Sequence, residues 1–229
     1  MPKKLTTPLS LHISATPLSP SSFAPFGDVI ANPHPDIRPS ASLPSNLSHN
    51  AVSANQHTAI KYQNLQQPPS PSGNPPISTL LPYTYAGPSR AGLFRVDILE
   101  RHPFTTQTFV PLAASAGVPH AAYLVIVAPT LPAEGEDSSL PAPKTGGKGP
   151  GRPDLANLKA FVATPGQAVT YGAGTWHAPM VALGPPGTAI DFVVIASGVG
   201  AEDCQEVVIE AQGEGVVVQV PERMPVAKL

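Results

Sequence analysis

Short runs of β-branched and aromatic residues, separated by Gly and Pro, recur along the chain. Such runs are typical of β-strands. Helical periodicity is nearly absent: only 17–26 and 154–158 can form a helical turn or two, the first because Ser19 and Pro20 supply an N-cap followed by proline. The runs predict strands at 9–14, 58–62, 93–100, 107–112, 122–128, 157–163, 167–171, 189–196, 206–210 and 215–220. No internal repeat is visible, so we expect one all-β domain over 1–229, an antiparallel sandwich or barrel.

Three stretches, 33–44, 66–76 and 129–153, lack this periodicity and are rich in Pro, Gly and Ser. Such composition is typical of loops or partly disordered insertions. Their proline-rich pieces could also bind aromatic grooves of partner domains. Mobile surface loops are the interpretation we favour.

Composition narrows the class of protein. The chain has 31 Pro among its 229 residues, and only 12% of its residues are charged. Average proteins contain about 5% Pro and about 25% charged residues. Frequent proline excludes helix bundles and coiled coils, and the net charge of −2 excludes a nucleic-acid binder that relies on bulk basicity. No apolar run reaches the roughly 20 residues of a membrane span, and the N-terminus lacks an apolar signal segment. We expect a soluble, intracellular protein.

The single cysteine, Cys204, excludes an intramolecular disulfide and a thiolate zinc site. No cysteine-nucleophile motif surrounds it. A buried or merely exposed thiol is therefore a better interpretation than a catalytic one.

Charged residues are densest at 99–103, on a predicted strand. Strand alternation places Glu100 and His102 on one face and Arg101 on the other. Val96 and Ile98 share the parity of Glu100, so we predict that this face is buried. A buried carboxylate and imidazole must then face a cavity, a ligand or each other. The alternative is a Glu–His pair at a strand end that is partly exposed to water.

A second candidate patch spans 165–179, where three glycines precede the only Trp, Trp176. Glycine at this density predicts a tight turn with closely approaching backbones. His177 then begins the next strand, either as a structural histidine or as a ligand.

Together the two patches resemble the two sequence motifs of cupins. The first motif, with two ligands one residue apart and a third five residues later, matches Glu100, His102 and Gln107; the second ends in G-x-x-H, matching Gly174 to His177. The resemblance implies a cupin-like antiparallel β-barrel or jelly roll in which these four side chains converge, often on a divalent metal. Gln is a weaker ligand than the usual carboxylate, so a divalent transition metal is allowed but not required.

Longer blocks resemble the ureidoglycolate lyase family, in its fungal-type form, over nearly the whole chain. The blocks occur in the family's order: SFAPFGDVI (22–30), TAIKY (58–62), LERHPFTTQTFVPL (99–112), PDLANLKAF (153–161), TWHAP (175–179) and DFVVIASG (191–198). The resemblance implies a homodimeric carbon–nitrogen lyase that splits ureidoglycolate into glyoxylate and urea, late in allantoin breakdown. Two positions depart from the family pattern: Ala178 replaces a common second histidine, and His57 replaces a usual glycine.

Ureidoglycolate is a carbinolamide, whose cleavage needs a base at the hydroxyl, an acid at the leaving nitrogen and a cation at the carboxylate. On this resemblance, Glu100, His102 and His177 are the catalytic candidates. Either histidine can accept the hydroxyl proton, while Glu100 orients an imidazole or passes a proton. If a metal is bound, these three residues and Gln107 become its ligands.

The substrate-binding candidates are more scattered. Gln107 can hydrogen-bond the ureido or carboxylate oxygens. Lys61 is our first choice as carboxylate anchor, and Arg90 is the alternative, although it can equally be a solvated loop charge. Tyr171 and Trp176 either line the pocket or pack in the core.

Two other functions remain open: an amidohydrolase that acts on ureidoglycolate and releases ammonia, or a non-catalytic cupin that binds a small carboxylate. The tripeptide Ala227-Lys228-Leu229 resembles the signal read by the peroxisomal import receptor. It predicts a peroxisomal protein, the alternative being an ordinary tail on a cytoplasmic one.

Overall fold

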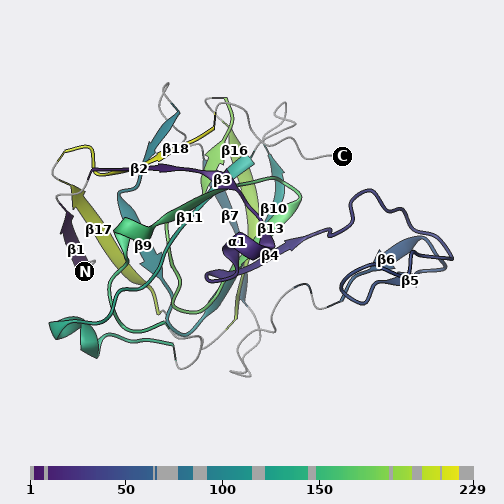
Figure 1. The fold of residues 1–229 in the computed structure, drawn as a ribbon, viewed down its shortest axis with the longest axis horizontal. Helices are drawn as coiled ribbons and strands as arrows, with labels where there is room; N and C mark the ends of the chain where they lie inside the picture. Colours follow the sequence, from purple (N-terminus) through teal and green to yellow (C-terminus); the bar gives the residue numbers. More distant parts are fainter. Residues whose placement is uncertain are drawn as a thin grey trace.

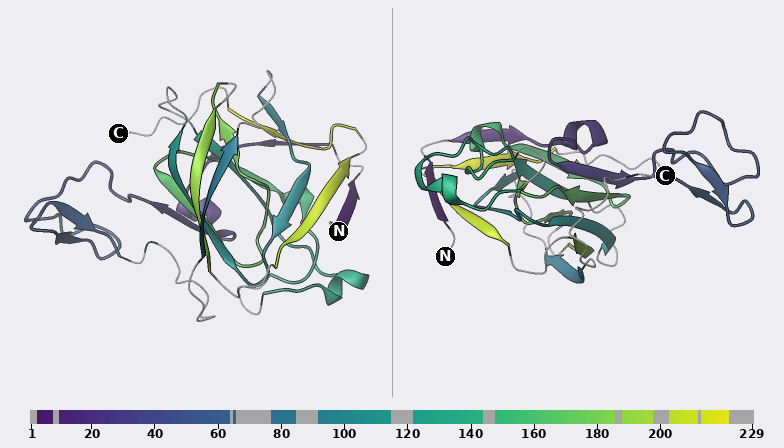
Figure 2. Two further views of the ribbon diagram at one scale, coloured as in Figure 1. Left: turned by 180° about the vertical axis from the view of Figure 1, so that it is seen from behind. Right: turned by 90° about the horizontal axis from the view of Figure 1, so that it is seen from below.

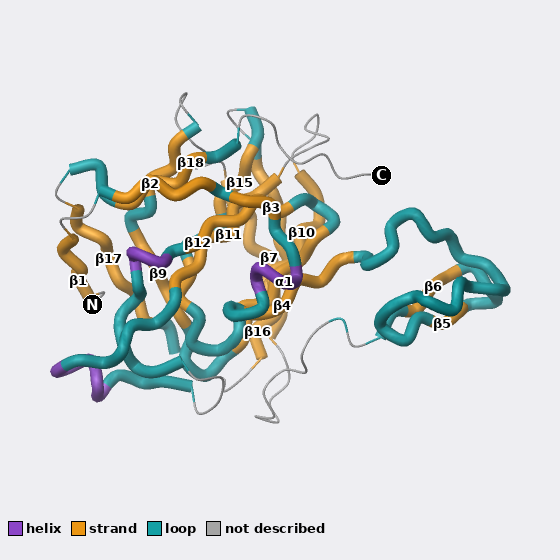
Figure 3. Tube along the Cα trace, in the orientation of Figure 1, coloured by secondary structure: helices purple, strands orange, loops and turns teal. Residues whose placement is uncertain are grey.

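A computed structural model describes residues 3–7, 10–63, 65, 77–84, 92–114, 122–143, 148–185, 188–197, 203–211 and 213–221. Arg90, the stretch 66–76 and the tripeptide 227–229 lie outside the described residues. The described chain is mainly β, with one short α-helix, α1 (Pro20–Phe23), and two 3-10 turns, η1 (Gly135–Ser139) and η2 (Leu155–Asn157) (Figure 3). The expected all-β class is confirmed at this level.

Most of the strands form two large sheets (Figure 1). The eight-stranded sheet follows the order β1 (Lys3–Thr7), β17 (Gln205–Ala211), β9 (Ile98–Arg101), β14 (Trp176–His177), β11 (Ala122–Ala128), β12 (Lys159–Ala163) and β3 (Thr16–Pro17), with β15 (Val181–Leu183) paired to β11. The five-stranded sheet follows the order β4 (Gly27–Ala31), β13 (Gln167–Tyr171), β10 (Thr106–Ala114), β16 (Ala189–Ser197) and β7 (Ile77–Thr84).

Two smaller sheets complete the described fold. One contains β2 (Leu11–Ser14), β18 (Val216–Gln219) and β8 (Leu93–Arg95), and the other is the hairpin of β5 (Val52–Ala54) and β6 (Ala59–Lys61). The hairpin projects away from the sheets (Figures 1 and 2). Its turn includes His57 at a φ of 69°, a left-handed conformation that favours glycine. His57 therefore stands at a position whose backbone explains the usual glycine.

The pairing of the described strands differs from a simple antiparallel barrel. The N-terminal strands β1, β2 and β3 pair in parallel with β17, β18 and β12, whereas the remaining pairs are antiparallel. The prediction of a purely antiparallel architecture is wrong for these pairs, because the N-terminal segment runs alongside strands that follow it much later in the chain. The pairing among the described strands does not close a single barrel.

Strand β11 is buried on both faces and separates two hydrophobic cores. Tyr123, Val125 and Val127 face an inner core that joins the eight-stranded to the five-stranded sheet, with aromatic residues from α1, β10, β12, β13 and β16. Leu124 and Ile126 face an outer core shared with β18. The inner core matters most for function, because the cross-strand partner of Val127 is His177.

Several sequence predictions are confirmed. Strands β11 and β13 have the predicted bounds, and Ser19 caps α1, its Oγ accepting a hydrogen bond from Ser22 N at 3.2 Å. The expected strand at 93–100 is instead two strands in different sheets, β8 and β9, separated at Val96 and Asp97.

Because of this break, the prediction from strand alternation that the face of Glu100 and His102 is the buried one is wrong. Leu99 and Arg101 are the fully buried residues of β9, while Ile98, Glu100 and His102 are only partly buried. Both faces of β9 are therefore covered. Since the chain changes sheets after Arg95, the alternation before the break does not continue beyond it.

The described parts of 129–153 are held against the body rather than free. Arg101 donates hydrogen bonds to the carbonyl oxygens of Pro141, Gly149 and Pro150, and its guanidinium lies 4.5 Å from the ring centre of Trp176. Apart from η1, the backbone in the described parts of 129–153 is irregular, as expected of a loop, but these contacts do not fit a mobile one. In the described part of the chain, no helix is long and apolar enough to cross a membrane.

Candidate functional site

Glu100 and His177 are directly opposite on neighbouring strands β9 and β14. His177 Nε2 lies 3.4 Å from Glu100 Oε1, and the two side chains are 2% and 25% exposed. This is an ion-pair distance without close hydrogen-bond geometry, because Nε2 has no hydrogen-bond partner within the described residues. Contact with the His177 ring has the largest effect on the pKa of Glu100 and lowers it; together with the charges of His177 and His102 it outweighs burial, which raises the pKa.

The backbone fixes the orientation of His177. A tight turn precedes it, in which Gly174 adopts a φ of 74° and donates its N–H to the carbonyl of His102 at 2.8 Å. His177 Nδ1 lies 2.9 Å from the carbonyl oxygen of Thr175. A carbonyl can only accept, so Nδ1 carries a hydrogen and Nε2 is directed at Glu100. The predicted glycine turn is confirmed, and its role is to aim this ring.

Tyr171 forms one wall of the site. Its ring stacks on His177, with ring centres 4.0 Å apart and planes 17° from parallel. Tyr171 belongs to the inner core and is the cross-strand partner of Gln107 on β10. The five-stranded sheet thus brings Tyr171 and Gln107 toward the histidine of the eight-stranded sheet.

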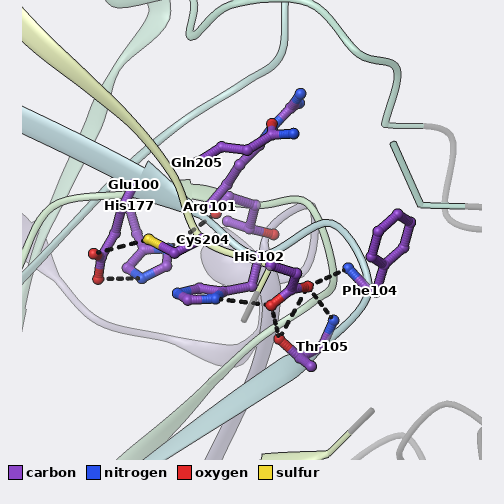
Figure 4. A network of polar contacts seen from close by, with 10 residues as sticks. Glu100, Arg101, His102, Phe104, Thr105, His177, Cys204 and Gln205 are labelled. Atoms are coloured by element: carbon purple, nitrogen blue, oxygen red, sulfur yellow. Dashed lines mark hydrogen bonds and ion pairs between the residues drawn. The ribbon is translucent and has the colours of Figure 1, made fainter. Parts of the chain in front are cut away.

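The ring of His102 also stacks with His177, with ring centres 6.0 Å apart and planes 30° from parallel. Its Nδ1 lies 3.2 Å from Asp203 Oδ1, and the two side chains are 16% and 6% exposed. Asp203 comes from the segment just before β17, which pairs with β9. Figure 4 shows the second ring nitrogen of His102 on the side of Glu100 and His177.

Cys204 completes this side of the site. Its Sγ lies 3.7 Å from Glu100 Oε2 (Figure 4). Burial, followed by the nearby carboxylates of Glu100, Glu206 and Asp203, raises the pKa of the thiol to about 12. A neutral thiol is a poor nucleophile, which supports the sequence interpretation of Cys204 while placing it inside the site.

The donor set fits a divalent transition metal. One ligand atom each from Glu100, His102 and Cys204 lie within 4.8 Å of one another. His177 Nε2 and Gln107 Oε1 are buried and lack hydrogen-bond partners within the described residues. Carboxylate, imidazole and sulfur are ligands such ions accept. The cysteine was absent from the ligand set read from the sequence.

Residues 10–216 match the ureidoglycolate lyase family. This chain belongs to the ureidoglycolate lyase family. Its relatives include the ureidoglycolate lyase of Schizosaccharomyces pombe, 34% identical over 203 residues that cover 84% of this chain and 89% of the relative. The ureidoglycolate lyase of Saccharomyces cerevisiae is 33% identical over 193 residues, 80% of this chain and 84% of the relative. That of Burkholderia mallei is 30% identical over 187 residues, 81% and 82% respectively.

The predicted site residues divide into two groups in this member of the ureidoglycolate lyase family. Glu100, His102 and His177 come together as expected, with Tyr171 against them and Gln107 paired to Tyr171. These residues occupy one polar end of the inner core. The resemblance drawn from the LERHP and TWHAP blocks is confirmed as family membership.

Two other candidates lie elsewhere. Lys61 is exposed on β6, in the hairpin that projects from the body (Figure 1). Trp176 lies in the outer core, where its Nε1 donates to the Gly151 carbonyl at 3.3 Å, so the alternative interpretation of Trp176 as a packing residue is the one observed. The structure brings neither to the site, and Arg90 lies outside the described residues.

Asp203 and Cys204 were not predicted as site residues. Neither belongs to a recognisable motif, and both lie in the segment directly before β17. One sequence feature points to them: the strand predicted at 206–210 could pair with the strand that carries Glu100. Such pairing would place the residues just before 206 next to Glu100 and His102.

Proposed function

We propose that this protein is a lyase that cleaves ureidoglycolate into glyoxylate and urea, a step of allantoin and purine degradation. The observation that carries the proposal is Glu100 facing Nε2 of His177, with His102 beside them, in a chain of the ureidoglycolate lyase family. A carboxylate and two imidazoles supply the base and the acid that carbinolamide cleavage requires.

In the proposed reaction, His102 removes the proton from the substrate hydroxyl. The oxygen electrons form the carbonyl of glyoxylate, the carbon–nitrogen bond breaks, and its electron pair goes to the ureido nitrogen. His102 suits the base role because the Asp203 carboxylate can compensate the positive charge that the ring gains.

His177 and Glu100 deliver the proton to the leaving nitrogen. Nδ1 of His177 stays on the Thr175 carbonyl, so a proton held between the imidazole and the carboxylate is on Nε2 or on Glu100. Urea then leaves as a neutral molecule. After product release, the proton that His102 took from the substrate returns to the His177–Glu100 pair, which restores the starting state.

If a divalent metal were held by Glu100, His102 and Cys204, with His177 and Gln107 as further donors, it would polarise the substrate oxygens in place of proton transfer by those side chains. Gln107, whose amide oxygen lacks a partner within the described residues, is also placed to accept a hydrogen bond from a ureido N–H. We also propose, from the family resemblance, that this protein has a cupin-like barrel and forms a homodimer.

The test is glyoxylate and urea formation from ureidoglycolate by the purified protein. We expect equal amounts of both from the wild type and a decrease of at least about 100-fold in His102→Asn. His12→Asn is the matched control, since His12 is exposed and pairs with Glu214 away from the site; it should retain turnover. The proposal fails if the wild type forms no glyoxylate.

Product analysis separates the alternatives. Ammonia in place of intact urea would identify an amidohydrolase. Binding of glyoxylate without any turnover, unaffected by His102→Asn, would identify a non-catalytic carboxylate-binding protein.

A further inference from the structure

The carboxylate of Asp203 is surrounded by hydrogen-bond donors. Oδ2 accepts from the backbone N–H of Phe104 at 2.6 Å and from that of Thr105 at 3.1 Å. Thr105 Oγ1 lies 3.0 Å from Oδ1 and 3.3 Å from Oδ2. The fourth partner is Nδ1 of His102 at 3.2 Å (Figure 4). The carboxylate is 6% exposed, so these contacts fix its position.

These contacts determine which nitrogen of His102 carries the hydrogen. A carboxylate with this set of donors only accepts, so Nδ1 must donate to Oδ1. In the neutral ring, Nε2 then bears the lone pair, on the side of Glu100 and His177 (Figure 4). A lone pair there can take a proton or bind a cation, whereas an N–H there can do neither.

We propose that Asp203 is the positioning residue of this site: it holds His102 in the tautomer whose Nε2 accepts the substrate proton. The role of that proton rests on the function proposed above, but the tautomer does not. The hydroxyl of Thr105 and the backbone N–H groups of 104 and 105 support this role indirectly, because they hold the Asp203 carboxylate in place. The strand pairing of β17 with β9 supplies the connection, because it sets the segment before β17 beside His102.

Asp203→Asn is the discriminating substitution because it conserves shape. The two backbone N–H groups at Oδ2 require an acceptor, so the amide oxygen of the substituted side chain takes that place. Its NH₂ group then faces Nδ1 of His102 and donates to it. The hydrogen moves to Nε2, which turns the proton acceptor of the site into a donor. The same substitution at the triad aspartate of serine proteases lowers kcat about 10⁴-fold for this reason.

The first measurement is the tautomer of His102 by ¹⁵N NMR of the imidazoles, assigned with His102→Gln. We expect Nδ1–H in the wild type and Nε2–H in Asp203→Asn. The second is steady-state kinetics on ureidoglycolate, where Asp203→Asn should lower kcat at least about 100-fold and leave KM within about three-fold. Asp137→Asn is the control, because it also removes a buried carboxylate, paired with Arg152 outside the site; its kcat should stay within about two-fold.

A double variant tests whether Asp203 acts through His102. If it does, Asp203→Asn adds little to the loss already caused by His102→Gln. If ¹⁵N NMR of the wild type shows the hydrogen of His102 on Nε2, the proposal is wrong. This result depends neither on an activity assay nor on the stability of a variant. An unchanged kcat in a folded Asp203→Asn with the reversed tautomer would also overturn the proposal. If the wild type forms no glyoxylate while Nδ1–H is observed, the proposed function fails and the positioning of His102 stands.

Discussion

His177 and Glu100 face each other across β14 and β9, and the carboxylate oxygen nearest the ring lies 3.4 Å from Nε2. Glu100→Gln keeps the shape of the side chain but removes its charge and its capacity to hold a proton. We expect kcat to decrease about 100-fold or more, with thermal stability little changed. Steady-state glyoxylate assays and a thermal melt measure both quantities.

Glu210→Gln is the control for this substitution. Glu210 lies on β17, exposed and paired with Lys4, so neutralising it should not affect turnover. Equal kcat for Glu100→Gln and wild type would exclude the carboxylate from proton transfer.

A second prediction concerns Cys204, whose thiol has a pKa raised to about 12 by burial and by neighbouring carboxylates. At pH 8 almost none of it is thiolate, so alkylation by iodoacetamide should be at least about 100-fold slower than that of a free cysteine with an ordinary pKa of about 8.5. In the metal-free acid–base reaction proposed above, Cys204 has no role, so Cys204→Ala should retain turnover within a few-fold in metal-free protein. Rapid alkylation at pH 8, followed by mass spectrometry, would contradict this account.

Arg101 provides a prediction about stability rather than activity. The side chain is fully buried and donates to the carbonyl oxygens of Pro141, Gly149 and Pro150. Lysine cannot reproduce this planar fork, so Arg101→Lys should lower the free energy of unfolding by about 2 kcal/mol or more. Urea titration followed by fluorescence gives the value.

Arg95→Lys is the matched control, since Arg95 is exposed and its guanidinium pairs with the exposed Asp97. An exposed pair contributes about 0–1 kcal/mol. If both substitutions changed the free energy of unfolding equally, the contacts of Arg101 with Pro141, Gly149 and Pro150 would not stabilise the fold.

Lys148 predicts a dependence of stability on pH. Its Nζ donates to Thr175 Oγ1 at 2.6 Å, and burial lowers its pKa to about 8 from the ordinary 10.5. Between these two values the unfolded chain binds more protons than the folded chain. The contribution of Lys148 to the free energy of unfolding therefore increases as pH rises from about 8 to 10.5.

Lys148→Met removes this contribution. The difference in free energy of unfolding between wild type and Lys148→Met should change with pH across that window, in favour of the wild type at higher pH. Lys159→Met, at an exposed residue of β12, is the control for loss of a lysine outside a buried contact. A constant difference for Lys148→Met, in urea titrations at pH 7.5 and 10, would contradict the prediction.

The sequence predicts best what depends on local composition. Strand β11 is a continuous apolar run and β13 a short run containing Val, Thr and Tyr, each next to turn residues, so their bounds follow from the sequence. The short strands β3 and β15 could not, because two or three residues carry no periodicity. The break between β8 and β9 was missed since Val96 continues the pattern while the backbone changes sheets.

The same limit applies to the site. Glu100, His102 and His177 could be found because they stand in spaced motifs. Asp203 could not, because its role depends on a contact with a residue 101 positions away in the chain. The family block favours Lys61 as the carboxylate anchor, and only the arrangement in space shows that β6, which carries Lys61, lies apart from β9, which carries Glu100 (Figure 1).

The alternation of β9 has a consequence for genetic variation in this protein. The side chains of Glu100 and His102 face His177 in the candidate site, whereas Arg101 binds the carbonyl oxygens of Pro141, Gly149 and Pro150. A survey of all single substitutions can score the cellular abundance of each variant and its enzymatic activity separately. We expect the two scores to differ at neighbouring positions of β9. Changes at 100 and 102 should give abundant protein without output, and changes at 101 should deplete the protein itself.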